Sequence, residues 1–231
     1  MVSESEEIIR RYERRKLIPE GRYSPLNAST YMSEQEKERA LIKMIKREKL
    51  EPLGNKRLLE IGCGTGINLL QLIRLGFQSS NLFANDILAE RLMEAKKRLP
   101  NQVSFFEGNI LNQNFDDEVF DIVFQSMVFS SILDRDFKKK LALKMWNWTK
   151  PGGGILWYDF IYNNPRNKDV KGVSLSEIND LFPVQNVNFY RLTLAPPISR
   201  ILTKVHPILY SVFSSLYFLR THILCFVKKP S

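Results

Sequence analysis

The sequence predicts an α/β fold with an open, mostly parallel sheet flanked by helices. Residues 58–66, LLEIGCGTG, join an apolar run to three glycines, as in a buried strand that turns sharply into a helix. Residues 150–160, KPGGGILWYDF, place a glycine-rich turn before another buried strand. Strand and helix patterns alternate from Lys56 onward, which is typical of parallel strands joined by helical crossovers.

The composition is that of a globular protein of one large domain. The chain has 231 residues, of which 44% are hydrophobic and 26% charged. Its first residues are polar and charged, so we expect no signal peptide. Cys63 and Cys225 have no disulfide or metal-ligand spacing, and there are only two histidines. We therefore expect a cytoplasmic protein with reduced thiols and no metal site.

The amino-terminal 50 residues have their own pattern. Apolar spacing predicts a helix over residues 5–16 and another from about Ser33, where Glu36 completes a capping box. The segment between them, residues 19–27, has the Pro, Gly and Asn content of a loop. We therefore interpret residues 1–50 as a helical segment that precedes the main domain.

The glycine turn indicates what kind of ligand it receives. Gly62, Gly64 and Gly66 allow backbone conformations that are closed to other residues, so a ligand can approach the main chain. Glu60 lies at the end of the preceding strand, and the helix pattern of residues 67–75 follows. Because a carboxylate repels phosphate, a ligand with hydroxyls, an amino group and a sulfonium cation fits better than a dinucleotide.

These strings resemble the cofactor loop and fifth strand of class I S-adenosylmethionine-dependent methyltransferases. The resemblance covers residues 56–160 and implies S-adenosylmethionine as cofactor. It also implies a Rossmann-like sheet of seven strands in the order 3-2-1-4-5-7-6, within a methyltransferase domain over residues 51–231 that carries a helical insertion at about 197–219. In this family a variable amino-terminal segment often covers the site, which is the role we expect for residues 1–50.

Later strand ends complete the expected cofactor site. Asp86 ends the second strand twenty residues after Gly66, where an acidic side chain binds the ribose hydroxyls. Asn109 stands where the family has an Asp that accepts the adenine amino group, and its amide oxygen can accept the same bond. We expect the fourth strand to end near the methionine arm of S-adenosylmethionine. The expected cofactor residues are Glu60, Gly62, Cys63, Gly64, Gly66, Asn68, Asp86, Ile87, Asn109, Ile110, Gln125 and Ser126.

The fifth strand and two loops supply the candidates for catalysis. Tyr158 and Asp159 end that strand, so we expect Asp159 as general base and Tyr158 as orienting group. Loops at this edge carry specificity, and the substrate candidates are Arg22, Tyr23, Asn163 and Arg166.

The acceptor follows less directly from the sequence. The chain lacks the Asn-Pro-Pro-Tyr type string of enzymes that methylate planar nitrogens. It is more similar to enzymes that modify small metabolites or saccharides, so we expect a hydroxyl oxygen as acceptor. An RNA or protein methyltransferase, and a non-catalytic module that keeps the fold, remain alternatives.

The carboxyl-terminal section is purely basic, since no acidic residue follows Asp180. Such a surface attracts an anionic or lipid-linked substrate, anionic lipid or, as a weaker expectation, nucleic acid, but it can equally be a solvated face. The uncharged run over residues 205–219 is shorter than the roughly twenty residues of a spanning helix. We expect one or two packed helices there, with peripheral membrane contact as the alternative.

Overall fold

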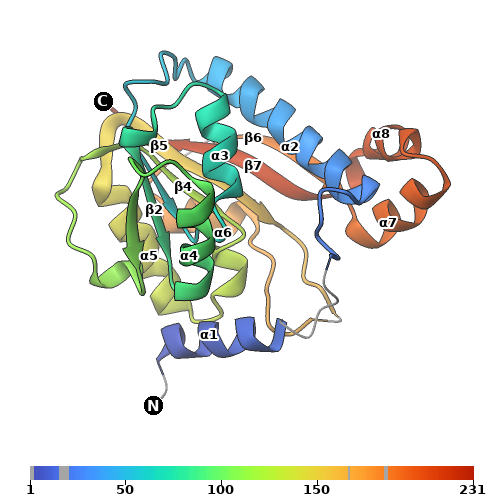
Figure 1. Cartoon of the computed structure of the whole chain (residues 1–231), viewed down its shortest axis with the longest axis horizontal. Helices are drawn as coiled ribbons and strands as arrows, with labels where there is room; N and C mark the ends of the chain where they lie inside the picture. The colour runs from blue at the N-terminus through green and yellow to red at the C-terminus, as the bar shows by residue number, and fades with distance from the viewer. Residues whose placement is uncertain (1–2, 16–20, 166, 185–186) are drawn as a thin grey trace.

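The structure is a computed structural model that describes residues 3–15, 21–165, 167–184 and 187–231. Its centre is a seven-stranded sheet in the order β3-β2-β1-β4-β5-β7-β6 (Figure 1). Strands β1 to β5 run parallel, whereas β7 runs antiparallel to both β5 and β6. This arrangement confirms the predicted Rossmann-like fold and its strand order.

Most of the strands are buried on both faces over most of their length. The whole of β1 is buried, with Leu59 in register between Phe83 and Val123, which explains its continuous apolar run. The strands are β1 (Leu58–Ile61), β2 (Leu82–Asp86), β3 (Ser104–Glu107), β4 (Phe120–Ser126), β5 (Thr149–Phe160), β6 (Asn188–Leu194) and β7 (Arg220–Lys228).

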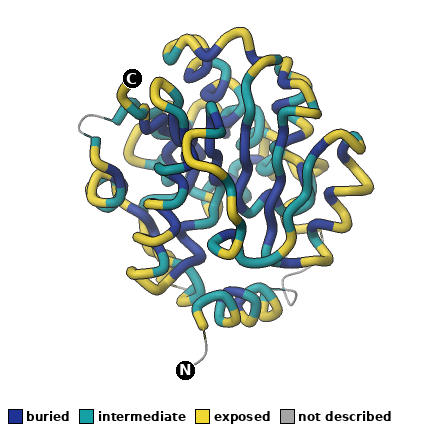
Figure 2. Tube along the Cα trace, turned by 90° about the vertical axis from the view of Figure 1, so that its left-hand side faces the viewer, coloured by how far each residue is buried: buried dark blue, intermediate teal, exposed yellow. Residues whose placement is uncertain are grey.

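Helices cover both faces of the sheet and leave the buried residues in the strands between them (Figure 2). On one face lie α2 (Ala28–Arg47), α3 (Ile67–Arg74) and α4 (Ala89–Arg98). On the other face lie α5 (Arg135–Trp148) and α6 (Leu175–Leu181). Each face therefore has its own apolar core, and the parallel strands end together at one edge.

The first 50 residues divide into two parts with different roles. Helix α2 packs into the core through Met44, whose side chain is fully buried, so it belongs to a layer of the domain. Only α1 (Glu4–Arg15) lies across the edge where the parallel strands end (Figure 1). The predicted helix start near Ser33 is wrong: α2 begins at Ala28, and the Ser33 hydroxyl donates to the Thr30 carbonyl within the helix.

The segment between β6 and β7 is helical, as predicted. It forms α7 (Pro196–Val205), α8 (Ile208–Ser214) and a 3-10 turn at Tyr217–Leu219, which project beside α2 (Figure 1). Within the described residues, no helix combines the length and apolar character needed to cross a bilayer.

Candidate functional site

The three glycines after β1 serve different purposes, although all have positive φ. A β-carbon on Gly62 would lie 2.5 Å from the Val128 Cγ2 atom, and one on Gly66 would lie 2.7 Å from the Leu99 Cδ1 atom. These two glycines are therefore required by protein packing. At Gly64 the nearest atom would be 3.9 Å away, on the mobile end of Arg91, so this position leaves room for a ligand.

A hollow lies at the edge where β1, β2 and β3 end. It has about 520 Å³ of empty space, a volume that includes the open solvent at its mouth. Helices α1 and α5 and residues 128–132, which follow β4, form the rest of its wall. It is lined by Ile8, Tyr12, Ile61, Gly62, Asn85, Asp86, Ile87, Gly108, Asn109, Ile110, Val128, Ser131, Ile132, Phe137 and Leu141.

Five predicted cofactor residues line this hollow: Gly62, Asp86, Ile87, Asn109 and Ile110. The Asp86 carboxylate accepts the backbone N–H of Gly64 at 2.8 Å and that of Leu88 at 2.9 Å. Each oxygen keeps a further lone pair for a ligand hydroxyl. Burial is the largest cause of the raised pKa of Asp86, and the two backbone bonds act against it. The side chain is therefore fixed in position before any ligand arrives.

Asn109 begins a 3-10 turn at the end of β3. The strand stops at Glu107 because Gly108 has φ +90° and Ile110–Asn112 turn back. The Asn109 Oδ1 atom accepts the backbone N–H of Leu111 at 3.0 Å. An amide oxygen has two lone pairs, so the predicted bond from a ligand amino group remains compatible with this geometry.

Glu60 is a fully buried carboxyl group with one unpaired oxygen. Its Oε1 atom accepts from the Asn68 Nδ2 atom at 2.7 Å, and Lys37 donates to the Asn68 Oδ1 atom at 3.1 Å. The Oε2 atom is buried without a hydrogen-bond partner among the described residues. Burial raises the pKa of Glu60 to about 8. A cation placed beside the orphaned oxygen would satisfy it, although Glu60 is not among the residues that line the hollow.

Cys63 contributes its backbone and not its thiol. The Cys63 N–H donates to the Asn85 carbonyl at 2.8 Å, which ties the glycine turn to β2. Burial, followed by the Glu60 carboxyl group, raises the pKa of the Cys63 thiol, so the thiol is unreactive at neutral pH.

Gln125 and Ser126 end β4, as predicted, but the Gln125 amide is occupied within the protein. Its Oε1 atom accepts the Val128 N–H at 3.0 Å, and its Nε2 atom donates to the Tyr158 carbonyl at 3.4 Å. These bonds shape the loop that brings Val128 into the wall of the hollow. Ser126 is half-buried and lies in register with Tyr158.

Tyr158 and Asp159 lie at the end of β5 and point to opposite faces of the sheet. The Tyr158 hydroxyl bonds with the Thr193 hydroxyl at 2.8 Å, and its ring stacks on His222. The Asp159 carboxylate is fully buried and accepts the N–H groups of Ser130 and Phe160 at 3.0 and 2.9 Å. Burial raises the pKa of Asp159 to about 7. Neither side chain lines the hollow.

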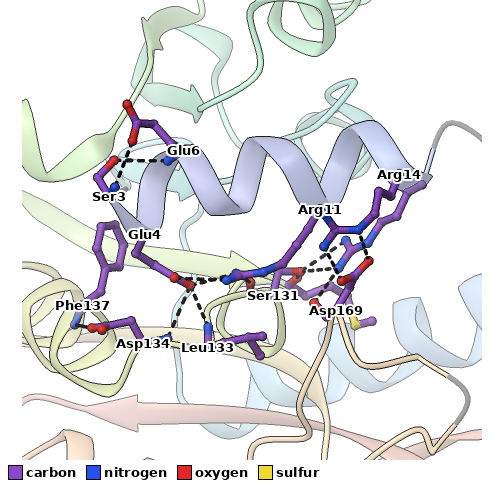
Figure 3. Close-up of polar contacts among 12 residues, drawn as sticks. Ser3, Glu4, Glu6, Arg11, Arg14, Ser131, Leu133, Asp134, Phe137 and Asp169 are labelled. Carbon is purple, nitrogen blue, oxygen red and sulfur yellow. Dashed lines mark hydrogen bonds and ion pairs between the residues drawn. The ribbon is translucent and has the colours of Figure 1, made fainter. Parts of the chain in front are cut away.

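Helix α1 closes the hollow through contacts that the sequence did not reveal (Figure 3). Arg11 is buried, pairs with Glu4 at 2.8 Å and donates to the Ser131 carbonyl at 2.9 Å. Arg14 forms an ion pair with Asp169 at 2.5 Å. Ile8 and Tyr12 face the hollow, and their four-residue spacing is the signal that could have marked them as wall residues.

The four substrate candidates are dispersed. Arg22 and Tyr23 are exposed near Arg200, whose pKa is lowered by burial and by the Arg22 charge. Asn163 is exposed, and its side-chain oxygen accepts the Gly172 N–H at 3.0 Å. The fourth candidate, Arg166, lies outside the described residues. Arg191, which was not among the predicted substrate residues, bonds to the Tyr162 hydroxyl and packs on Tyr217.

Comparisons with known proteins concern the domain family and the fold. Residues 58–153 match the model of a methyltransferase domain family. No curated protein sequence matches significantly. Many solved structures are similar, among them an S-adenosylmethionine-dependent methyltransferase from Mesorhizobium loti, with 13% identity, TM-score 0.56 and coverage of 79% of this chain and 95% of that chain.

Two further structures extend the comparison. A methyltransferase from Archaeoglobus fulgidus is 16% identical over 82% of this chain and 93% of its own, with TM-score 0.58. A phosphoethanolamine N-methyltransferase from Haemonchus contortus, solved with phosphomonomethylethanolamine and S-adenosylhomocysteine, is 16% identical. It covers 100% of this chain and 61% of its own, with TM-score 0.64. At these identities the likeness concerns the fold.

Proposed function

We propose that the chain is a class I methyltransferase that uses S-adenosylmethionine, and that it methylates a small-molecule or saccharide acceptor at a hydroxyl oxygen. The observation that carries the cofactor assignment is the juxtaposition of an open glycine position, Gly64, with the carboxyl groups of Glu60 and Asp86. S-adenosylmethionine needs all three of these features. It needs room to approach the main chain, a carboxylate that binds its ribose hydroxyls and a second carboxylate that binds a cationic group.

The residues present fit the cofactor. We propose that Asp86 binds the ribose hydroxyls and that Asn109 and Ile110 hold the adenine in the hollow. Glu60, with its orphaned Oε2 atom, would bind the amino group of the methionine arm. When bound, S-adenosylmethionine supplies a methyl group that is activated by its sulfonium. Because the methyl group is already electrophilic, the chain's main contributions are alignment and exclusion of water.

Asp159 and Tyr158 remain our candidates beside the acceptor. The pKa of Asp159, about 7, suits a general base, but its two oxygens already accept backbone N–H groups. Replacing Asp159 with asparagine separates two roles. If Asp159 is the general base, the variant should have a lower kcat, and kcat should no longer rise as the pH passes through 7. If Asp159 only positions other groups, the variant should have a lower melting temperature and an unchanged pH profile of kcat.

Arginine side chains on the proposed substrate side of the protein, which we call the acceptor side, favour an anionic methyl acceptor. They are Arg22, Arg191 and Arg200. Burial and the nearby Arg22 charge lower the pKa of Arg200, and the Arg191 guanidinium packs against the rings of Tyr162 and Tyr217. Guanidinium groups in such surroundings attract phosphate or carboxylate groups. We propose Arg22, Tyr23, Asn163 and Arg166 as substrate contacts and add Arg191 to them.

Both cysteines are buried and free, which supports a cytoplasmic location.

A screen with labelled S-adenosylmethionine tests the proposal. Sugars, lipid-linked saccharides and small hydroxyl compounds, with and without anionic groups, would be compared with RNA and with protein extracts. We expect label in a hydroxyl compound. Label found only in RNA, with RNA binding that depends steeply on salt, would establish the RNA methyltransferase alternative. Label found in protein would establish the protein methyltransferase alternative. Cofactor binding without any transfer would favour the non-catalytic module.

A further inference from the structure

Helices α7 and α8 and the segment up to the turn after them expose seven large apolar side chains, which we call the apolar stripe. Val205, Phe218 and Ile201 are the most exposed, at 75%, 70% and 69%. Soluble proteins seldom place so many apolar side chains together on a short exposed segment. The stripe consists of Ile201, Val205, Ile208, Val212, Leu216, Tyr217 and Phe218.

The opposite side of the two helices is anchored firmly. Tyr210 and Ser214 are buried, and their hydroxyls bond to the Glu36 carboxylate of α2 at 2.7 and 2.6 Å. Ser199 and Thr203 of α7 are buried as well. The helices therefore cannot turn the stripe inward without breaking these bonds, so it is presented outward by a fixed support.

Cations border the stripe, and acids are absent from its segment. Arg200 and the exposed Lys204 lie on α7, and Arg22 lies close to Arg200. No acidic residue occurs after Asp180, which includes the whole of α7 and α8. An apolar face with cations and without acids is the composition of helices that lie in the interface of an anionic membrane.

We propose that the apolar stripe docks this protein on an anionic lipid bilayer. The apolar side chains would enter the boundary between headgroups and acyl chains, while Arg200, Lys204 and Arg22 would contact anionic headgroups. Helices of 10 and 7 residues are too short to span a bilayer, so they would lie in its plane. A second copy of the chain is a poorer occupant, because its own cations would meet these cations across the contact.

The position of the stripe deepens the acceptor assignment, and this step rests on the proposed function. Tyr217 belongs to the stripe and packs on Arg191, 4.9 Å from ring centre to guanidinium carbon. Arg191 bonds in turn to Tyr162, in the loop after β5. Docking would therefore bring Arg191 and Tyr162 close to the lipid headgroups. This position favours a lipid-linked anionic saccharide as the methyl acceptor.

Vesicle sedimentation tests the docking without any use of catalysis. We expect the protein to bind vesicles of phosphatidylglycerol and phosphatidylcholine at low salt, and at least tenfold more weakly to phosphatidylcholine alone. The double variants Ile201→Ser/Val205→Ser and Arg200→Glu/Lys204→Glu should each lose on the order of tenfold in binding. The matched controls Met93→Ser/Leu143→Ser and Lys139→Glu/Lys140→Glu, at exposed sites elsewhere, should bind like the wild type.

A labelled variant gives a second readout. Cys63 and Cys225 are buried, so Ile201→Cys can be labelled selectively with an environment-sensitive dye. We expect a blue shift with anionic vesicles, and none for Met93→Cys.

Three results would overturn the docking proposal. They are absence of binding to anionic vesicles, equal losses in the control variants, and a dimer without vesicles that Ile201→Ser/Val205→Ser converts to a monomer. Calorimetry with S-adenosylhomocysteine on the same proteins keeps the two proposals distinct. Vesicle binding without cofactor binding would refute the proposed function alone, and the reverse would refute docking alone.

Discussion

Gly64 is the residue of the glycine turn at which an added β-carbon would meet no protein atom closer than 3.9 Å, and we propose that the cofactor occupies this space. We predict that Gly64→Ala weakens binding of S-adenosylhomocysteine at least about tenfold, because the methyl group occupies ligand space. Its φ of +55° adds a strain of about 1–2 kcal/mol to the folded state. Isothermal titration calorimetry measures the first effect, and thermal melting measures the second.

Gly76→Ala is the matched control for this prediction. Gly76 also has a positive φ, +113°, and no atom lies within 4 Å of an added β-carbon. The variant should therefore melt earlier but bind S-adenosylhomocysteine like the wild type. Equal affinities for Gly64→Ala and wild type would contradict the assignment of Gly64.

We expect Glu60 to couple cofactor binding to proton release. Burial raises the pKa of Glu60 to about 8, so its carboxyl group is mostly protonated in the free protein at pH 7. A cationic amino group beside it favours the ionised form, so we predict that binding releases a proton and that affinity rises from pH 6 to 8. Calorimetry at pH 7 in buffers of different ionisation enthalpy should detect this proton, and Glu60→Gln should abolish it. A pH-independent affinity of the wild type would refute the coupling.

Residues within a motif could be predicted, and residues brought in by packing could not. The positions of Glu60 and Asp86 followed from their spacing to the glycines, because a strand end and its turn are local in sequence. Lys37 reaches Asn68 only because α2 packs beside α3, which no spacing reveals. The occupied amide of Gln125 likewise depends on a partner in β5.

At the scale of elements, α1 is predicted to act as a cover that slows cofactor release. Arg11→Ala would remove the bonds to Glu4 and to the Ser131 carbonyl and leave both acceptors without this donor near the hollow. We predict faster amide exchange across residues 4–15 and at least about tenfold faster dissociation of S-adenosylhomocysteine. Exchange mass spectrometry and stopped-flow measurements would detect these changes.

The control for α1 is Arg10→Ala on the same helix. Arg10 is 59% exposed and pairs with Glu7 at the surface, an interaction worth at most about 1 kcal/mol. This variant should leave exchange and dissociation unchanged. If both variants behaved alike, helix propensity and not the buried contacts would explain the effect.

Element order was predictable in two different ways. Alternating strands and helices indicated the parallel half from the residues themselves, whereas the insertion of β7 between β5 and β6 came from family resemblance. Element ends were less predictable. The start of α2 at Ala28 and the end of β3 at Glu107 depend on turns that several residue types allow.

The whole molecule carries buried carboxyl groups whose effects on stability oppose that of a buried histidine. Burial raises the pKa of Glu60 to about 8 and of Asp159 to about 7, so the folded state retains protons that the unfolded state releases above pH 4 to 5. Stability from these groups therefore falls as pH rises to their folded pKa values. His222 acts in the opposite direction between pH 3 and 6.5, because burial lowers its pKa to about 3.

The window from pH 6.5 to 8 consequently isolates the carboxyl groups. We predict that the free protein loses up to about 2 kcal/mol of stability across it, and that Glu60→Gln removes most of this loss. S-adenosylhomocysteine at about 100 times its Kd adds about 2.7 kcal/mol, or roughly 5–10 °C in Tm for a chain of this size. Because the ligand favours ionised Glu60, at a fixed ligand concentration its shift in Tm should be larger at pH 8 than at pH 6.5. Thermal melting over this range measures all three effects, and a shift that shrinks with pH would mean that Glu60 does not face the bound cation.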